Sequence, residues 1–312
     1  MNDRARATSD RLHERARAFV RAFEAGAPMP EPFDALGCDI ARFQAERVPT
    51  YARLCAARGV DAAAIRAVAE APAVPTDVFK MASVFAFGAA DAVATFRTSG
   101  TTQDSRGAHA MRTTATYDAA AAAFARWALV EGMPSPLTVL ALAPPPSEAP
   151  DSSLGHMMAE LARRFGSAGD VEGSFFLGGG VIDMIGLDER VARLLVEERG
   201  SVLLLATSFA LVHLLEGMDE VTFRLPPGSR VMQTGGFKGR SREVPAAELR
   251  AEISRVFCIE ERDVVCEYGM TELSSQFYET TARGSARHGV YAEPPWARVD
   301  PVDPVTLEPV PP

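Results

Sequence analysis

A stretch rich in hydroxyl groups, Thr98-Ser99-Gly100-Thr101-Thr102, holds residue types that can bind phosphate. Hydroxyls and free backbone N–H groups at this density can surround the oxygens of a polyphosphate, and Gly100 lets the backbone approach them closely. Arg106, just beyond, can add a permanently protonated guanidinium. The stretch differs from the loop of P-loop NTPases, and ordinary polar turns use the same residues. It therefore indicates a phosphate-binding loop, with a turn of no chemical role as the alternative.

A second stretch, Glu267-Tyr268-Gly269-Met270-Thr271-Glu272, combines an aromatic ring, a hydroxyl and a carboxylate. Tyr268 can stack on a purine, Thr271 can bind an α-phosphate, and Glu272 can hold Mg²⁺. The alternative is a strand-to-helix connection in which Thr271 or Glu272 caps the next helix. Each stretch follows an expected strand, so the two together indicate a nucleotide site more strongly than either does alone.

The elements that would position these stretches are those of an α/β fold. From Val74 onward, short β-like runs alternate with amphipathic helical runs. The candidate strands are 93–97, 137–143, 202–206, 230–232 and 264–267, and the candidate helices are 118–130, 153–165, 188–198 and 245–257. Ligands of such sheets bind in the loops at the carboxyl ends of the strands. Both stretches lie in loops of this kind.

The first 70 residues have a helical pattern instead. Leu12, Ala16, Phe19 and Phe23 recur at spacings of 4, 3 and 4, which places them on one face of a helix. The arginines scattered among them favour a solvated helix face over a nucleic-acid or partner surface. We therefore expect a helical N-terminal segment over residues 1–70 and an ATP- and acid-binding core over residues 71–312.

Composition excludes several classes of protein. The chain has 32 Lys+Arg against 41 Asp+Glu, a net charge of -9, and no dense basic run, so nucleic acid is not an expected partner. Its apolar runs are far shorter than the ~20 residues of a membrane-spanning helix, and its start lacks the order of a secretory signal. We therefore expect a cytoplasmic protein. The four cysteines are too dispersed for structural zinc or a disulfide framework.

The two motifs together resemble those of the adenylate-forming superfamily, which contains acyl-CoA synthetases, adenylation domains and luciferases. Within it, the chain is most similar to the acyl-protein synthetase branch (LuxE-like), which activates fatty acids for bacterial bioluminescence. Four further stretches carry this narrower likeness: Val74-Pro75-Thr76-Asp77-Val78-Phe79-Lys80, Asp151-Ser152-Ser153-Leu154-Gly155-His156-Met157, Gly235-Gly236-Phe237-Lys238-Gly239-Arg240 and Leu273-Ser274-Ser275-Gln276.

The resemblance implies a role for each motif residue. The β- and γ-phosphates would contact Ser99, Gly100, Thr101 and Thr102, with Arg106 in place of the lysine of many relatives. The resemblance implies an adenine-side wall of Gly235 and Gly236, stacking by Tyr268, an α-phosphate contact by Thr271 and Mg²⁺ binding by Glu272. The remaining motif members Thr98, Gly269 and Met270 complete the expected nucleotide site. Gln103 departs from the pattern, because relatives usually have glycine there.

The implied reaction activates a carboxylic acid, fatty or aromatic, with ATP as an acyl-adenylate and passes the acyl group to a thiol. The acceptor is a cysteine of a partner protein in an acyl-protein synthetase, or coenzyme A in an enzyme similar to phenylacetate-CoA ligase. We expect the acid pocket to be lined by His156, Phe176, Ser208 and Phe209, although His156 also fits a hydrogen-bonded core position.

Relatives follow such a region with a small C-terminal lid domain that carries a catalytic lysine. No such domain is recognisable before Pro312. The expected fold is therefore the large N-terminal domain alone, with mixed sheets flanked by helices. A non-catalytic nucleotide-binding module that lacks its lid is the alternative to a ligase.

Overall fold

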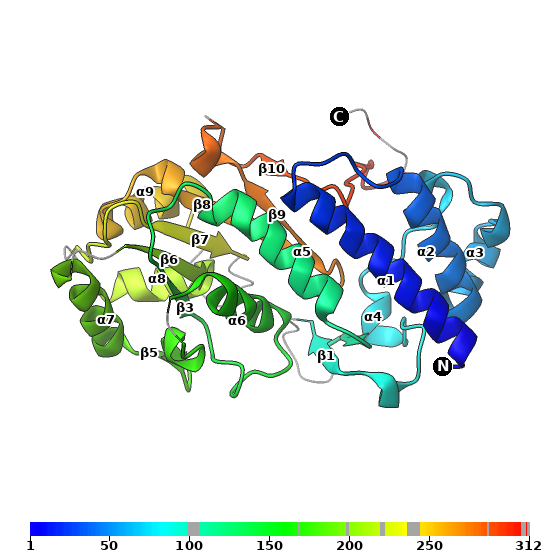
Figure 1. The fold of residues 1–312 in the computed structure, drawn as a ribbon, viewed down its shortest axis with the longest axis horizontal. Helices are drawn as coiled ribbons and strands as arrows, with labels where there is room; N and C mark the ends of the chain where they lie inside the picture. The colour runs from blue at the N-terminus through cyan, green and yellow to red at the C-terminus, as the bar shows by residue number, and fades with distance from the viewer. Residues whose placement is uncertain are drawn as a thin grey trace.

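A six-stranded mixed sheet forms the centre of the computed structural model (Figure 1). The structure describes residues 1–98, 106–167, 169–197, 200–218, 222–235, 244–285, 287–306 and 310. The strands lie in the order β10-β9-β8-β7-β6-β3. Their bounds are β3 Leu137–Leu142, β6 Ser201–Thr207, β7 Arg230–Thr234, β8 Val264–Met270, β9 Ser275–Glu279 and β10 Tyr291–Ala292. Strands β3, β6, β7 and β8 are parallel, whereas β9 and β10 are antiparallel to their neighbours.

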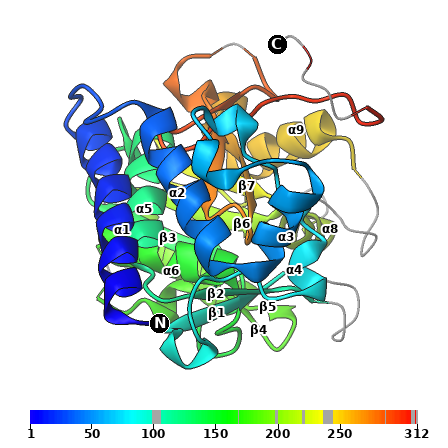
Figure 2. The same ribbon diagram turned by 90° about the vertical axis from the view of Figure 1, so that its right-hand side faces the viewer.

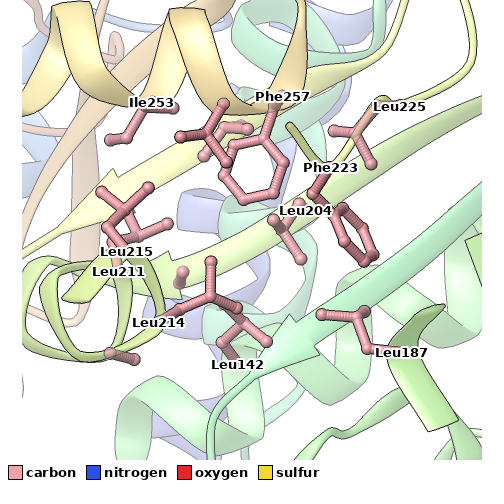
Figure 3. Packing of buried hydrophobic residues seen from close by; sticks show 14 of the residues in the cluster. Leu142, Leu187, Leu204, Leu211, Leu214, Leu215, Phe223, Leu225, Ile253 and Phe257 are labelled. Carbon is pink, nitrogen blue, oxygen red and sulfur yellow. The ribbon is translucent and has the colours of Figure 1, made fainter. Parts of the chain in front are cut away.

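Helices cover both faces of this sheet, which explains why the parallel strands β3 and β6 are buried and largely apolar. Side chains alternate between the faces, so Leu204 packs toward helices α8 and α9 whereas Leu203 and Leu205 pack toward α5 and α6. Figure 3 shows the first of these cores, which includes Leu142 and Leu204 of the sheet and Phe257 of α9. The covering helices are α5 Ala115–Ala125, α6 Ser153–Phe165, α7 Met184–Val196, α8 Ser208–Glu216 and α9 Ala246–Phe257.

The N-terminal helices α1 Asp3–Glu24, α2 Phe33–Arg47 and α3 Pro49–Ala57 pack beside the sheet layer. Helix α1 lies along α5, and α2 and α3 extend the molecule beyond it (Figures 1 and 2). Phe23 of α1 contacts Phe124 and Trp127 of the α5 segment and also Trp296 near the C-terminus. The N-terminal segment therefore shares a hydrophobic core with the sheet region. Its description as a separate domain stays a prediction.

Two short hairpins and one short helix complete the architecture. Hairpin β1 Ala94–Arg97 with β2 Ala108–Met111 flanks the hydroxyl-rich stretch, and β4 Leu177–Gly178 pairs with β5 Val181–Ile182. Helix α4 Val78–Met81 precedes the first hairpin. Among the described residues, no helix combines the length and the apolar character needed to cross a bilayer.

The five candidate strands all match observed strands to within a few residues. The expected helix 118–130 is α5 followed by a π-helical turn over Arg126–Val130. Neither β2 nor β9 was predicted. Because a turn and strand β9 follow β8, the alternative in which Thr271 or Glu272 caps a helix is wrong.

Candidate active site

Four loops meet at the carboxyl edge of the parallel strands, where ligands of such sheets bind. Ser153 begins α6 after β3, Ser208 begins α8 after β6, Gly235 follows β7, and Thr271 follows β8. The register brings these strand ends level, since Thr207 pairs with Thr234 and Thr234 with Glu267. Ser153 Oγ lies 2.8 Å from Thr271 Oγ1, which joins the first loop to the last.

The base of the hydroxyl-rich stretch is a closed turn on the β1–β2 hairpin. Thr98 N donates to Gly107 O at 2.9 Å, and Gly107 N donates to Thr98 Oγ1 at 2.8 Å. Arg106 Nε donates to Thr98 O at 2.9 Å, and its Nη1 lies 3.1 Å from Asp151 Oδ2. The hydroxyl of Thr98 thus holds the turn together. Residues Ser99, Gly100, Thr101 and Thr102, with Gln103, lie outside the described part of the chain.

Contacts among the described residues link the β1–β2 hairpin to the turn after β8. Asp151 ion-pairs with Arg106, and Ser153, two residues further on, contacts Thr271. On the other side, His109 of β2 shares a 3.2 Å hydrogen bond with Ser274 in the turn that holds Glu272. The hairpin and the turn after β8 therefore lie side by side, as the resemblance requires.

The end of β8 and the turn after it carry groups of the kind that would bind a nucleotide and its metal ion. The Tyr268 side chain is 51% exposed, which is unusual for a tyrosine within a central strand. Lys80 of α4 lies near Glu272: its pKa is raised, first by the hydrogen bond from Lys80 to Asp77 and to a smaller extent by the Glu272 carboxylate. Sequence reasoning missed Lys80 as a site residue, although the stretch 74–80 was part of the likeness.

Gly235 occupies the end of β7 in a conformation that favours glycine, with φ +72°. No described atom lies within 4 Å of the position a Cβ would take. Its carbonyl accepts a 2.6 Å hydrogen bond from Ser208 Oγ, which in turn accepts from Gln233 Nε2 at 3.0 Å. This geometry fits a ligand lying flat against the strand end. Gly236 lies outside the described residues.

A buried carboxyl group, Glu267, lies directly beneath the exposed end of β8. It accepts a short hydrogen bond from Thr234 Oγ1 and is only 5% exposed. Burial raises the pKa of Glu267 to about 7. A side chain at position 269 would collide with this carboxyl group, which explains why Gly269 is required there.

A second pair of polar side chains lies next to the loop after β3. His156 Nε2 is 2.7 Å from Asp118 Oδ1, and its ring stacks on Tyr117 at 5.9 Å between ring centroids. Tyr117 OH donates to Ser153 O at 3.1 Å, which links this pair to the Ser153–Thr271 contact. His156 was among the predicted pocket residues, whereas Asp118 and Ser153 were not. Their separation along the chain leaves no local sequence signal.

The other predicted pocket residues have different surroundings. Phe176 is 8% exposed and belongs to the hydrophobic core on the α8 and α9 side of the sheet. Ser208 is buried and spans β6 and β7 through its hydrogen bonds. Phe209 is 39% exposed and stacks on His213. Their part in an acid pocket stays a prediction.

Comparison with solved structures identifies the fold class. The chain shares the α/β fold of a CoA ligase of known structure, and this confirms the predicted fold class. The structure of 2-hydroxyisobutyryl-CoA ligase, in complex with 2-HIB-AMP and CoA in the thioesterification state, matches with a TM-score of 0.58 and 16% identity, over 96% of this chain and 57% of that one. ATP-bound MatB from Rhodopseudomonas palustris matches with a TM-score of 0.45 and 18% identity, over 85% of this chain and 47% of that one.

The chain thus spans about half the length of the structures it matches. No family model and no curated protein sequence matches it. At these identities the likeness concerns the fold.

Proposed function

We propose that this protein binds ATP and activates a carboxylic acid as an acyl-adenylate. The observation that carries the proposal is the convergence of the β1–β2 hairpin with the Thr271–Glu272 turn, through the Arg106–Asp151 ion pair and the Ser153–Thr271 contact. This supports a nucleotide site in which the hairpin that carries Thr98 and Arg106 lies next to the candidate base and metal motif, at the ligand-binding edge of the sheet.

The residues present fit Mg·ATP. The exposed ring of Tyr268 can stack on adenine, and the base can lie against the end of β7 at Gly235. Thr271 contacts the α-phosphate, with its hydroxyl oriented by Ser153. Glu272 would hold the metal ion. Mg²⁺ commonly has only one or two protein carboxylates as ligands, together with substrate phosphates. The ion would neutralise negative charge on the phosphoryl oxygens.

The reaction follows from this arrangement. A carboxylate oxygen of the acid attacks the α-phosphorus, a new P–O bond forms, and the bond to the β-phosphate oxygen breaks to release pyrophosphate. Thr271 and Arg106 stabilise the negative charge that develops, and one such preorganised donor is worth about 3 kcal/mol of activation free energy. Most of the remaining effect comes from placing the acid in line with the leaving group.

The second half-reaction transfers the acyl group to a thiol. Cys38 and Cys55 are buried, and burial raises the pKa of Cys266 to about 11, so little thiolate forms there at neutral pH. Cys258 is exposed, but it lies between α9 and the start of β8, at the opposite end of that strand from Thr271. Coenzyme A or a cysteine of a partner protein is therefore the better acceptor. CoA-dependent release of AMP supports the first, and a labelled acyl group trapped on a partner protein supports the second, LuxE-like reaction.

Pyrophosphate exchange into ATP, measured across a panel of acids, tests the adenylation step. We expect exchange with at least one acid, and loss of metal-dependent exchange in Glu272→Gln. The matched control is Glu252→Gln on α9, whose side chain is 44% exposed. Thermal stabilisation by Mg·ATP without exchange for any acid would instead favour a nucleotide-binding module. Normal exchange by Glu272→Gln would remove that residue from the site.

A further inference from the structure

A cavity of about 560 Å³ separates the N-terminal helices from the candidate active site. Its apolar lining comes from elements far apart in the sequence. It includes Leu12 of α1, Phe43 of α2, Phe87 in the segment after α4, and Met111 of β2. The cavity is partly open to solvent, and its size falls within the ~300–1,000 Å³ typical of small-molecule sites.

One wall of the cavity is the turn that carries the candidate metal ligand. Glu272, Leu273, Ser274 and Ser275 all line it. His109 lines it too and hydrogen-bonds Ser274 at 3.2 Å. A ligand in the cavity therefore has one end at the turn where the acid must meet the α-phosphate.

The charged groups of the lining define the kind of occupant. Arg112 is ion-paired with Asp10, and Arg298 lies 2.9 Å from Asp300. Burial lowers the pKa of both His13 and His109, which keeps their imidazoles neutral at neutral pH. Apart from these two ion-paired guanidinium groups and Glu272, the side chains that line the walls are apolar or neutral. Glu272, with Lys80 nearby, marks the polar end.

We propose that this cavity binds the aliphatic chain of the acid, with the carboxylate at the Glu272 turn and the N-terminal helices setting the accepted chain length. This rests on the proposed adenylation activity. An engineered apolar cavity of ~150 Å³ already holds benzene, so an acid with a single ring would leave most of this cavity empty. A linear chain extending from the turn toward α1 and α2 would fill it.

Narrowing and widening variants test the assignment. Ala16 of α1 lines the cavity, so Ala16→Phe should reduce pyrophosphate exchange with hexadecanoate by about tenfold or more, while exchange with butanoate changes less than about twofold. Phe43→Ala should raise exchange with hexadecanoate relative to octanoate. The matched control is Ala7→Phe, on an exposed position of α1, which should behave like the parent protein. The same chain-length profile in Ala16→Phe and Ala7→Phe would overturn the proposal.

A binding measurement separates failure of this inference from failure of the proposed function. Dansyl-undecanoate should bind the parent protein and Ala7→Phe saturably, and Ala16→Phe at least about tenfold more weakly. If no acid supports exchange but this pattern holds, the adenylation proposal fails and the cavity assignment stands. If exchange occurs but the probe binds all variants equally, the cavity does not hold the chain. A cooperative thermal transition in far-UV circular dichroism checks that each variant is folded.

Discussion

At the scale of single residues, Glu267 makes stability depend on pH. Burial raises its pKa from 4.5 to about 7, so the folded state binds the proton more tightly than the unfolded state does. Protonated Glu267 contributes its full stabilisation of the folded state below the unfolded-state pKa, and this contribution is lost as the pH rises through about 7. At one pKa unit per ~1.4 kcal/mol, the loss is at most about 3 kcal/mol.

Glu267→Gln should remove this dependence, because an amide keeps an acceptor for Thr234 and does not ionise. Melting temperatures of the two proteins between pH 5 and pH 8.5 provide the measurement. The variant should gain stability relative to the parent as the pH rises. Parallel curves across this range would show that the pKa of Glu267 is not raised on folding.

The sequence alone suggests candidate residues where the chemistry is local. Tyr268, Thr271 and Glu272 are close together in the chain, and their combination indicates a site before any fold is known. Ser153 contacts Thr271 across 118 positions of sequence. Such a contact depends on how α6 packs against the sheet, and residue types alone do not specify that packing.

At the scale of elements, a buried ion pair attaches α9 to the sheet. Arg250 Nη1 lies 3.0 Å from Glu279 Oε2 of β9 and also donates to Val264 O of β8 at 2.9 Å. The side chains are 5% and 1% exposed, respectively. Arg250→Met would leave a buried carboxylate without its cation, so we expect a loss of about 3–5 kcal/mol in the free energy of unfolding.

Chemical denaturation of three variants checks this prediction. The double variant Arg250→Met, Glu279→Leu should recover much of the loss, since it removes both charges. Arg255→Met is the control, because Arg255 lies on the same helix with its side chain 49% exposed. A double variant no more stable than Arg250→Met alone would show that the charge pair is not the source of the loss.

The residues of strand β9, which carries Glu279, show why this strand was not predicted. All five residues of Ser275–Glu279 are buried, and three of them are polar. Gln276 donates to Tyr117 OH and Glu279 pairs with Arg250, so tertiary partners satisfy groups that a strand pattern would place in solvent. The apolar strands β3 and β6 carry their signal in hydrophobicity itself and were predicted.

At the scale of the whole molecule, the N-terminal helices were predicted but their docking was not. Helical periodicity shows that α1 has an apolar face without showing what covers it. The structure packs α1 on α5 and α2 on α1, and residues of both N-terminal helices line the cavity that reaches Glu272. The candidate motifs could therefore be recognised in the sequence, whereas the cavity beside them could not.

This docking predicts cooperative unfolding. Both tryptophans of the chain, Trp127 and Trp296, lie in the cluster around Phe23 of α1. Their fluorescence consequently reports on the junction between the N-terminal segment and the sheet, whereas far-UV circular dichroism reports on all helices and strands. If the segment folds as one unit with the core, the two thermal transitions should coincide.

Phe23→Ala should then lower both midpoints together. We expect the free energy of unfolding to fall by about 2 kcal/mol. This is less than the 3–5 kcal/mol expected for a fully buried phenylalanine, because Phe23 is half-buried. Arg21→Ala, on an exposed position of the same helix, is the control and should shift neither midpoint appreciably. A fluorescence transition that precedes the dichroism transition, and that alone responds to Phe23→Ala, would mean that the helices detach before the sheet unfolds. The chain-length selectivity inferred for the cavity would then be lost at the lower of the two temperatures.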